Sequence, residues 1–129
     1  MNILITGSRR LTNVDVVFST LRKELKEGDA VIHGGASGAD SIASAYCNEN
    51  NIACTIMRPI YPSKGDYYLH RNAEMIGMCD RVIAFWDGES RGTKFTINYA
   101  RQRKLDVKVI KTTNNALNSG KESEVKDEN

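Results

Sequence analysis

Short apolar segments alternate along the chain with longer segments whose apolar residues recur at helical spacing. Residues 2–7, NILITG, form an apolar run ending at a glycine, which is typical of a buried strand. Residues 14–28, VDVVFSTLRKELKEG, place apolar side chains on one helical face and close with another glycine. This alternation predicts five strands and four helices. Further strands are expected at 29–34, 52–58, 80–86 and 106–111, and further helices at 38–50, 68–78 and 92–104.

The predicted strands are apolar at consecutive positions, as in AVIH at 30–33 and RVIAFW at 81–86. A strand with one wet face alternates apolar and polar residues, whereas consecutive apolar residues indicate a parallel sheet covered by helices on both faces. The pattern therefore predicts a three-layer α/β fold with an open parallel sheet of about five strands.

Glycines indicate the order of these strands. They follow the first, second and fourth strands, whereas the third ends in MRP at 57–59 without a glycine. Open α/β sheets bind ligands beyond the strand ends where the strand order reverses. The order 3-2-1-4-5 places the three glycine-bearing ends side by side, so we favour it over 2-1-3-4-5.

The domain is expected to cover residues 1–111. Residues 112–129 are polar and lack aromatic residues, so we expect a disordered C-terminal tail that buries too little surface to offset its ordering entropy. The segment 59–68 holds both prolines and is predicted to be a loop, with a lid as one reading.

Composition narrows the class of protein. The first ten residues, MNILITGSRR, lack the order of a secretory signal, and no apolar run is long enough to span a membrane, so we expect a cytoplasmic protein. The three cysteines form no CxxC pair and are interpreted as reduced core residues. The two histidines lack the spacing of metal ligands, so no metal site is expected.

The loop after the second predicted strand, GGASGAD at 34–40, has the composition of an anion cradle. Its glycines allow a tight turn and close approach of a ligand, and the following helix start presents backbone N–H groups that favour phosphate. A plain strand-to-helix turn capped by Ser37, with Asp40 complementing the helix dipole, explains the same residues.

Two further loops carry similar chemistry. The loop TGSRR at 6–10 supplies Arg9 and Arg10, whose planar guanidinium groups suit phosphate or carboxylate, although Arg10 is equally well read as a solvated charge. The loop WDGESRGTK at 86–94 combines a strand-end Trp86 and Asp87 with glycines and a helix start. Arg71 and Asn72, on the third predicted helix, can reach the same edge of the sheet.

Four segments together resemble a known family: ITGSR at 5–9, VIHGGASGAD at 31–40, RNAEMI at 71–76 and DRVIAFWDGESRGTKFTI at 80–97. They resemble the SLOG superfamily of Rossmann-like domains, and within it the small single-domain DUF2493 (YspA-type) proteins. The resemblance implies a nucleotide-related ligand and no required cofactor. It carries the family's phosphate-binding glycines over to Gly34, Gly35 and Gly38, and to Gly92 with Thr93.

The residues that we expect to bind this ligand lie in the three loops and at the start of the third helix. They are Gly7, Ser8, Arg9, Gly34, Gly35, Ala36, Ser37, Gly38, Asp40, Arg71, Asn72, Trp86, Asp87, Gly88, Ser90, Arg91, Gly92 and Thr93.

The resemblance leaves the activity open, because SLOG relatives include phosphoribohydrolases, DNA-processing proteins and sensors of NAD- or ADP-ribose-derived signals. The hydrolases follow their glycine–threonine pair by a glutamate three residues later, where this chain has Thr96. We therefore favour a sensor or sequestering protein for an ADP-ribose- or NAD-like nucleotide. The alternative is a nucleoside-phosphate N-glycosidase with Asp87 or Asp40 as catalytic carboxylate.

A DNA-processing, nucleic-acid-binding module is a third reading. The formal charge is +2, and the tail of two lysines and four carboxylates leaves about +4 on residues 1–111, without a stripe of basic and aromatic residues. Nucleic acid is therefore an unfavoured partner. A homo-oligomer is compatible with the resemblance, but no heptad pattern supports one.

Overall fold

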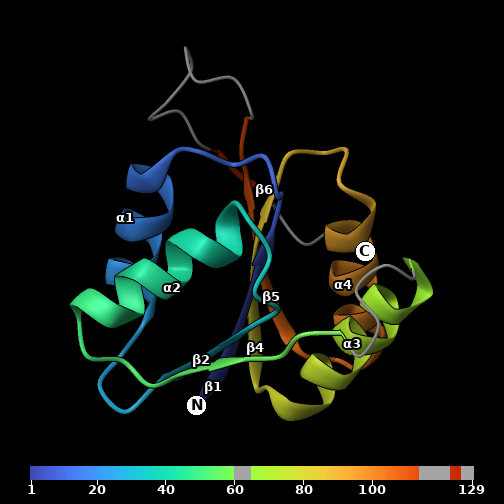
Figure 1. Cartoon of the computed structure of the whole chain (residues 1–129), viewed down its shortest axis with the longest axis horizontal. Helices are drawn as coiled ribbons and strands as arrows, with labels where there is room; N and C mark the ends of the chain where they lie inside the picture. Colours follow the sequence, from blue (N-terminus) through green and yellow to red (C-terminus); the bar gives the residue numbers. More distant parts are fainter. Residues whose placement is uncertain (60–64, 114–122, 126–129) are drawn as a thin grey trace.

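The protein folds as a sheet between two layers of helices (Figure 1). The computed structural model describes residues 1–59, 65–113 and 123–125. The sheet has the order β3-β2-β1-β4-β5-β6, with β1 to β5 parallel and β6 antiparallel to β5. The strands are β1 (Asn2–Gly7), β2 (Ala30–His33), β3 (Cys54–Ile56), β4 (Arg81–Trp86), β5 (Asp106–Lys111) and β6 (Ser123–Val125). The helices are α1 (Val14–Glu24), α2 (Ala39–Glu49), α3 (Gly65–Met78) and α4 (Arg91–Gln102).

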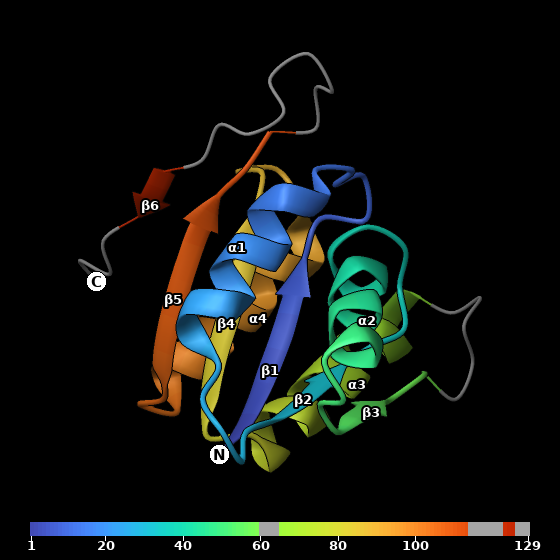
Figure 2. The ribbon, with the colours of Figure 1, turned by 90° about the vertical axis from the view of Figure 1, so that its left-hand side faces the viewer.

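Each face of the sheet has its own hydrophobic core. Figure 2 shows α1 and α2 covering one face, where Ile3 and Ile5 of β1 pack with residues of both helices. Leu4 lies between them in sequence and faces the opposite core, which α3 and α4 supply. Successive strand residues point to opposite faces, so two covered faces require consecutive apolar residues. The predicted three-layer, Rossmann-like α/β fold is therefore confirmed.

The predicted strand order 3-2-1-4-5 is also confirmed. The central strand β1 pairs with β2 on one side and β4 on the other, so that Leu4 lies opposite both Ile32 and Val82. One detail differs from the prediction: helix α3 begins at Gly65, inside the segment 59–68 that was predicted to be a loop or a lid. Residues 60–64 of that segment lie outside the described residues.

The C-terminal segment contributes an element that the sequence did not predict. Ser123–Val125 form β6, which pairs with β5 between Val109 and Lys111. Most of the predicted disordered tail, residues 114–122 and 126–129, lies outside the described residues and stays a prediction. This strand widens the sheet by one strand beside β5, so that β3 and β6 are the two edge strands.

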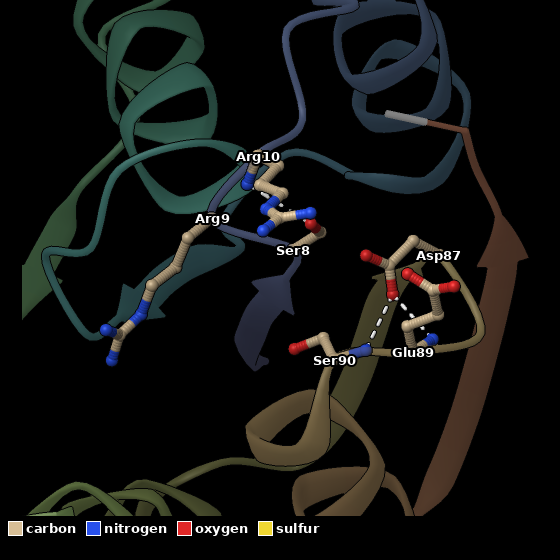
Figure 3. Close-up of a pocket in the computed structure, with 6 residues that line it drawn as sticks. All are labelled: Ser8, Arg9, Arg10, Asp87, Glu89 and Ser90. Carbon is tan, nitrogen blue, oxygen red and sulfur yellow. Dashed lines mark hydrogen bonds between the residues drawn. The ribbon is translucent and has the colours of Figure 1, made fainter. Parts of the chain in front are cut away.

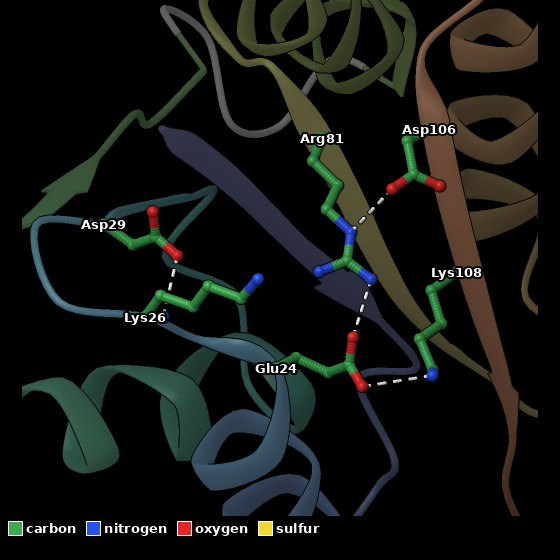
Figure 4. A network of polar contacts seen from close by, with 6 residues as sticks. All are labelled: Glu24, Lys26, Asp29, Arg81, Asp106 and Lys108. Carbon is green, nitrogen blue, oxygen red and sulfur yellow. Dashed lines mark hydrogen bonds and ion pairs between the residues drawn. The ribbon is translucent and has the colours of Figure 1, made fainter.

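A polar network ties α1 to the sheet at the edge where the parallel strands begin (Figure 4). Glu24, the last residue of α1, accepts from Arg81 at 2.7 Å and from Lys108 at 3.1 Å. Arg81 also lies 3.0 Å from a carboxylate oxygen of Asp106. Burial acts to raise the pKa of Glu24, but the hydrogen bonds and charges of Arg81 and Lys108 together lower it.

Candidate functional site

The loops that follow β1, β2 and β4 meet at the carboxyl edge of the sheet. The Ser8 amide donates to the carbonyl of Phe85 at 3.0 Å, and the Ala39 amide donates to the carbonyl of Ser8 at 3.1 Å. Gly7 permits this junction, because a Cβ there would lie 2.6 Å from both the Ala39 Cβ and the Phe85 oxygen. The residues that were predicted to bind a ligand from separate loops therefore lie at one place on the sheet.

Asp40 braces the glycine-rich loop from within. Its Oδ2 accepts from the amides of Gly34 at 3.1 Å and Ala36 at 3.2 Å, and its side chain is buried. Asp40 therefore holds the backbone of the loop that precedes its own helix. Two amides that an anion cradle would use are already bonded to a carboxylate of the chain itself.

Burial also changes the acidity of Asp40. Desolvation raises its pKa from 3.8 to about 6, against the opposing effect of the two amide bonds and of the Arg71 and Arg9 charges. A desolvated carboxyl group with a raised pKa in a cavity is a feature of functional sites. Asp40 therefore remains a candidate for chemistry as well as for bracing.

Arg71 holds the same loop from the opposite side. Its Nη1 donates to the carbonyl of Gly34 at 2.6 Å and to that of Met57 at 2.9 Å, while Nε donates to Asn72 Oδ1 at 2.9 Å. The side chain is 7% exposed. A Cβ on Gly34 would overlap the guanidinium group, so this glycine makes room for an arginine of the protein.

Arg58 occupies an equivalent position beside the next glycine. A Cβ on Gly35 would lie 2.7 Å from its Nη1, and Gly35 has a φ of +73° that side-chain-bearing residues rarely adopt. Arg58 follows β3, whose end carries no glycine, and it was not among the residues predicted to bind the ligand. The signal that was available is the position of β3 beside β2 in the predicted order.

The loop after β4 forms a turn around Asp87. Its Oδ1 accepts from the amides of Glu89 at 2.8 Å and Ser90 at 2.7 Å, as Figure 3 shows. Ser90 then caps α4, because its Oγ accepts from the Thr93 amide at 3.4 Å. The predicted helix start at this loop is therefore present, and Asp87 fixes the backbone of the two residues that precede α4.

In the described part of the chain, Arg9 lines each of three cavities that open among these loops. The carboxylate chamber has a volume of about 310 Å³ and is lined by Ser8, Arg9, Arg10, Asp87, Glu89 and Ser90 (Figure 3). The arginine chamber, of about 260 Å³, is lined by Arg9, Gly34, Gly35, Ala36, Ser37, Arg58 and Pro59. The deep chamber, of about 110 Å³, is lined by Thr6, Gly7, Arg9, Ala36, Asp40, Arg71, Asn72, Met75, Ser90, Gly92 and Thr93.

Four residues of the predicted site line none of these three chambers. Gly38 packs against the backbone of Ser8 and Arg9. Trp86 donates its indole N–H to the carbonyl of Ser90 at 3.1 Å and has the Lys111 ammonium 5.6 Å from its ring centroid. Gly88 and Arg91 are exposed. The residues that line a chamber without having been predicted to bind are Thr6, Arg10, Arg58, Pro59, Met75 and Glu89.

Two further features bear on the class of site. Among the described residues, no three His, Cys, Asp or Glu side chains gather in a way that would hold a metal ion. No helix in the described ranges combines the length and the apolar composition needed to cross a bilayer. The absence of a bound metal stays a prediction.

Solved structures share this fold. The chain superposes on DNA processing protein A from Helicobacter pylori with a TM-score of 0.70 and 22% identity, covering 84% of this chain and 64% of that one. For DNA processing protein A from Streptococcus pneumoniae the TM-score is 0.66 at 19% identity, over 84% of this chain and 49% of that one. The protein TM1055 gives 0.62 at 18% identity, over 82% and 71%. The chain thus spans about half to two-thirds of the DNA processing proteins.

Sequence comparison identifies the family of the chain. The Gene 61 protein of Mycobacterium phage D29 is 32% identical over 115 residues, which cover 81% of this chain and 92% of the phage protein. The YAcAr family, described as YspA, cpYpsA-related SLOG, matches residues 1–60, which hold β1 to β3 and the glycine-rich loop. The chain belongs to this YspA, cpYpsA-related family of the SLOG superfamily.

Proposed function

We propose that the protein binds a nucleotide or a nucleotide-derived small molecule, of the ADP-ribose or NAD type, at the carboxyl edge of its sheet. The observation that carries this proposal is that Arg9 lines three adjoining chambers at the reversal of strand order. Open α/β sheets bind ligands at this position. The carboxylate chamber, at about 310 Å³, is at the lower end of the range of about 300–1,000 Å³ for ligand pockets, so we expect one nucleotide to extend from it into a second chamber.

Different residues of the carboxylate chamber would bind the phosphate and the ribose of the ligand. Arg9 and Arg10 supply guanidinium groups for a phosphate, because these groups form charge-assisted, bidentate hydrogen bonds with oxyanions. Asp87 and Glu89 line the same chamber and supply carboxylate acceptors for ribose hydroxyls. A mixture of cations and carboxylates suits a sugar phosphate better than a bare anion.

Binding without turnover is favoured over hydrolysis. Thr96 stands where the related phosphoribohydrolases carry a glutamate, and this threonine is buried with its hydroxyl donating to the Gly92 carbonyl at 3.0 Å. The observation that favours the N-glycosidase alternative is the Asp40 carboxyl, with its pKa of about 6 in the deep chamber. Its Oδ2 is, however, committed to bracing the loop.

Single-stranded DNA is the second candidate ligand. The fold is shared with the H. pylori DNA processing protein A, whose structure was described together with its single-stranded DNA binding mode. This similarity goes against the expectation that nucleic acid is an unfavoured partner. The carboxylate chamber and the arginine chamber are lined by Arg9, Arg10 and Arg58. These arginines would contact a sugar-phosphate backbone.

The test starts from the freshly purified protein. Small molecules released by denaturation are identified by mass spectrometry, and each is titrated by calorimetry against wild type and the Arg9→Gln variant. We expect a nucleotide-derived compound whose affinity falls at least about tenfold in Arg9→Gln, because charge-assisted hydrogen bonds are lost. Arg22→Gln, an equal charge change on α1, is the control and should bind as wild type does.

The outcomes separate the three functions. An intact compound after prolonged incubation supports binding, whereas free base plus ribose phosphate identifies an N-glycosidase. That activity should disappear when Asp40 and Asp87 are both replaced by asparagine. Salt-sensitive binding of an oligothymidylate with no nucleotide binding supports the DNA reading. Equal affinity of wild type and Arg9→Gln for the compound contradicts the proposed site.

A further inference from the structure

Two adjacent glycines of the loop after β2 each admit an arginine from elsewhere in the chain. A Cβ on Gly34 would overlap the Arg71 guanidinium, and a Cβ on Gly35 would lie 2.7 Å from Arg58 Nη1. Both guanidinium charges also contribute to lowering the pKa of His33, after burial, which is the main cause. The loop is therefore flanked by two positive charges, of which the sequence analysis assigned only Arg71.

The two arginines differ in how many of their guanidinium donors already form hydrogen bonds within the protein. Arg71 is buried, and its guanidinium already donates to two backbone carbonyls and to Asn72. Arg58 is exposed, and within the described residues its guanidinium makes one hydrogen bond, from Nη1 to the Gly35 carbonyl at 3.3 Å. A planar guanidinium has five N–H donors, so Arg58 retains donors for an oxyanion.

The chamber next to Arg58 has the composition of an anion site. It is lined by Arg58 and Arg9, by Ser37, whose hydroxyl donates to the Arg9 carbonyl at 3.1 Å, and by residues of the glycine-rich loop. Among the described residues that line it there is no carboxylate, in contrast to the chamber that holds Asp87 and Glu89. Two arginine residues lining one chamber favour a phosphoryl group over a sugar.

Arg9 joins this chamber to the other two. It lines the carboxylate chamber together with Asp87 and the deep chamber together with Asp40. Figure 3 shows its side chain extending away from Asp87, while Arg10 lies close to Ser8. One ligand can therefore place a sugar beside the carboxylates, a phosphate beside Arg9 and a further phosphoryl group beside Arg58.

We propose that the arginine chamber is a second phosphoryl subsite, with Arg58 as the residue that selects ligands carrying a diphosphate over monophosphates. This inference rests on the proposed function and specifies its ligand class: a nucleoside diphosphate or a molecule linked through one. In this arrangement Arg9 contacts the phosphate common to both ligand types. Arg58 contacts the phosphoryl group that only the diphosphate has.

The test compares 5′-mono- and diphosphates of adenosine, guanosine, cytidine and uridine as calorimetric probes. For the base that binds best, wild type should prefer the diphosphate by about tenfold or more, the value of a charge-assisted hydrogen bond. Arg58→Gln should bind the diphosphate only as tightly as the monophosphate, with the monophosphate affinity unchanged. Arg22→Gln on α1 carries the same charge change and should keep the wild-type preference.

Failure of this inference differs from failure of the proposed function. If nucleotides bind but wild type shows no diphosphate preference, or Arg58→Gln retains it, the subsite is wrong and the nucleotide site stands. If Arg58→Gln weakens mono- and diphosphates equally, Arg58 acts on the shared phosphate and the selectivity role is overturned. If none of the eight probes binds, the diphosphate subsite is wrong, and the proposed function is decided by the compounds that the purified protein releases. Circular dichroism of each variant checks that the exposed substitutions leave the fold intact.

Discussion

At the scale of single residues, Asp40 combines a stabilising and a destabilising effect in one side chain. Its Oδ2 accepts two loop amides, which fixes the path of the chain between Gly34 and Ala36. Its charge is desolvated, and the resulting pKa of about 6 means that the folded state holds a proton more tightly than the unfolded chain does. Stability should therefore fall as pH rises between about 4 and 6.

Asp40→Asn should stabilise the protein at pH 8 by up to about 3 kcal/mol, the free energy that corresponds to a pKa shift from 3.8 to about 6. The amide oxygen of asparagine can accept the same two hydrogen bonds without carrying a charge. The gain should shrink towards pH 4, where wild-type Asp40 is protonated when folded. Urea unfolding across this pH range measures it, and Glu89→Gln, an exposed carboxylate of the same site, is the control. A gain that does not vary with pH would contradict the burial of an ionised Asp40.

At the scale of elements, the start of α2 depends on a backbone conformation that only glycine adopts readily. Gly38 precedes the helix with φ 74° and ψ −127°, and its Cα hydrogen faces the carbonyl region of Ser8 and Arg9. The Ala39 amide then reaches the Ser8 carbonyl, so α2 is docked onto the loop after β1. Gly38 thus serves the junction of two elements and lines none of the three chambers described.

Gly38→Ala should destabilise the protein by at least about 2 kcal/mol, because the new Cβ meets the Ser8 carbonyl and the backbone is strained. Gly77→Ala is the matched control, since Gly77 is an exposed helical residue with nothing within 4 Å of a Cβ. That variant should gain about 0.5–1 kcal/mol from the lower entropy of its unfolded chain. Chemical denaturation of both variants gives the comparison, and similar effects of the two substitutions would show that Gly38 is replaceable.

The sequence predicts elements better than it predicts partners. Consecutive apolar residues gave the covered sheet, and the glycines after β1, β2 and β4 gave the strand order, because both are local signals. The antiparallel pairing of β6 was missed, because it depends on an edge of the sheet that no local pattern of Ser123–Val125 reveals. Arg58 was missed for a similar reason, since its role arises from a neighbour 23 residues earlier in the chain.

At the scale of the whole molecule, the three chambers and the Glu24 network lie at opposite ends of the parallel strands. The chambers lie where the parallel strands end, whereas Glu24, Arg81 and Lys108 meet where β4 and β5 begin (Figure 4). These three side chains join α1 to two strands and are only 11–18% exposed. Their charges are therefore less screened by solvent than those of a surface pair.

Glu24→Gln should destabilise the protein by about 2 kcal/mol at pH 7, because it removes the carboxylate that two poorly solvated cations share and leaves Arg81 with only the exposed Asp106. The lowered pKa of Glu24 means that its contribution is present above its ordinary value of 4.5 and is lost as pH falls through the folded-state value. Glu74→Gln, which removes the exposed pair with His70, should change stability by less than about 0.5 kcal/mol. Unfolding at pH 7 and pH 3 tests both, and an equal loss at the two pH values would exclude an ionic origin.

The two glycine–arginine pairs restrict how this chain can change over evolution. Gly34 and Arg71 are 37 residues apart, and Gly35 and Arg58 are 23 apart, yet in each pair one residue vacates the space that the other fills. A side chain at position 34 requires the buried Arg71 guanidinium to move or to be lost, whereas the exposed Arg58 can swing aside from a side chain at position 35. Related sequences should therefore show linked substitutions at positions 34 and 71 more often than at positions 35 and 58.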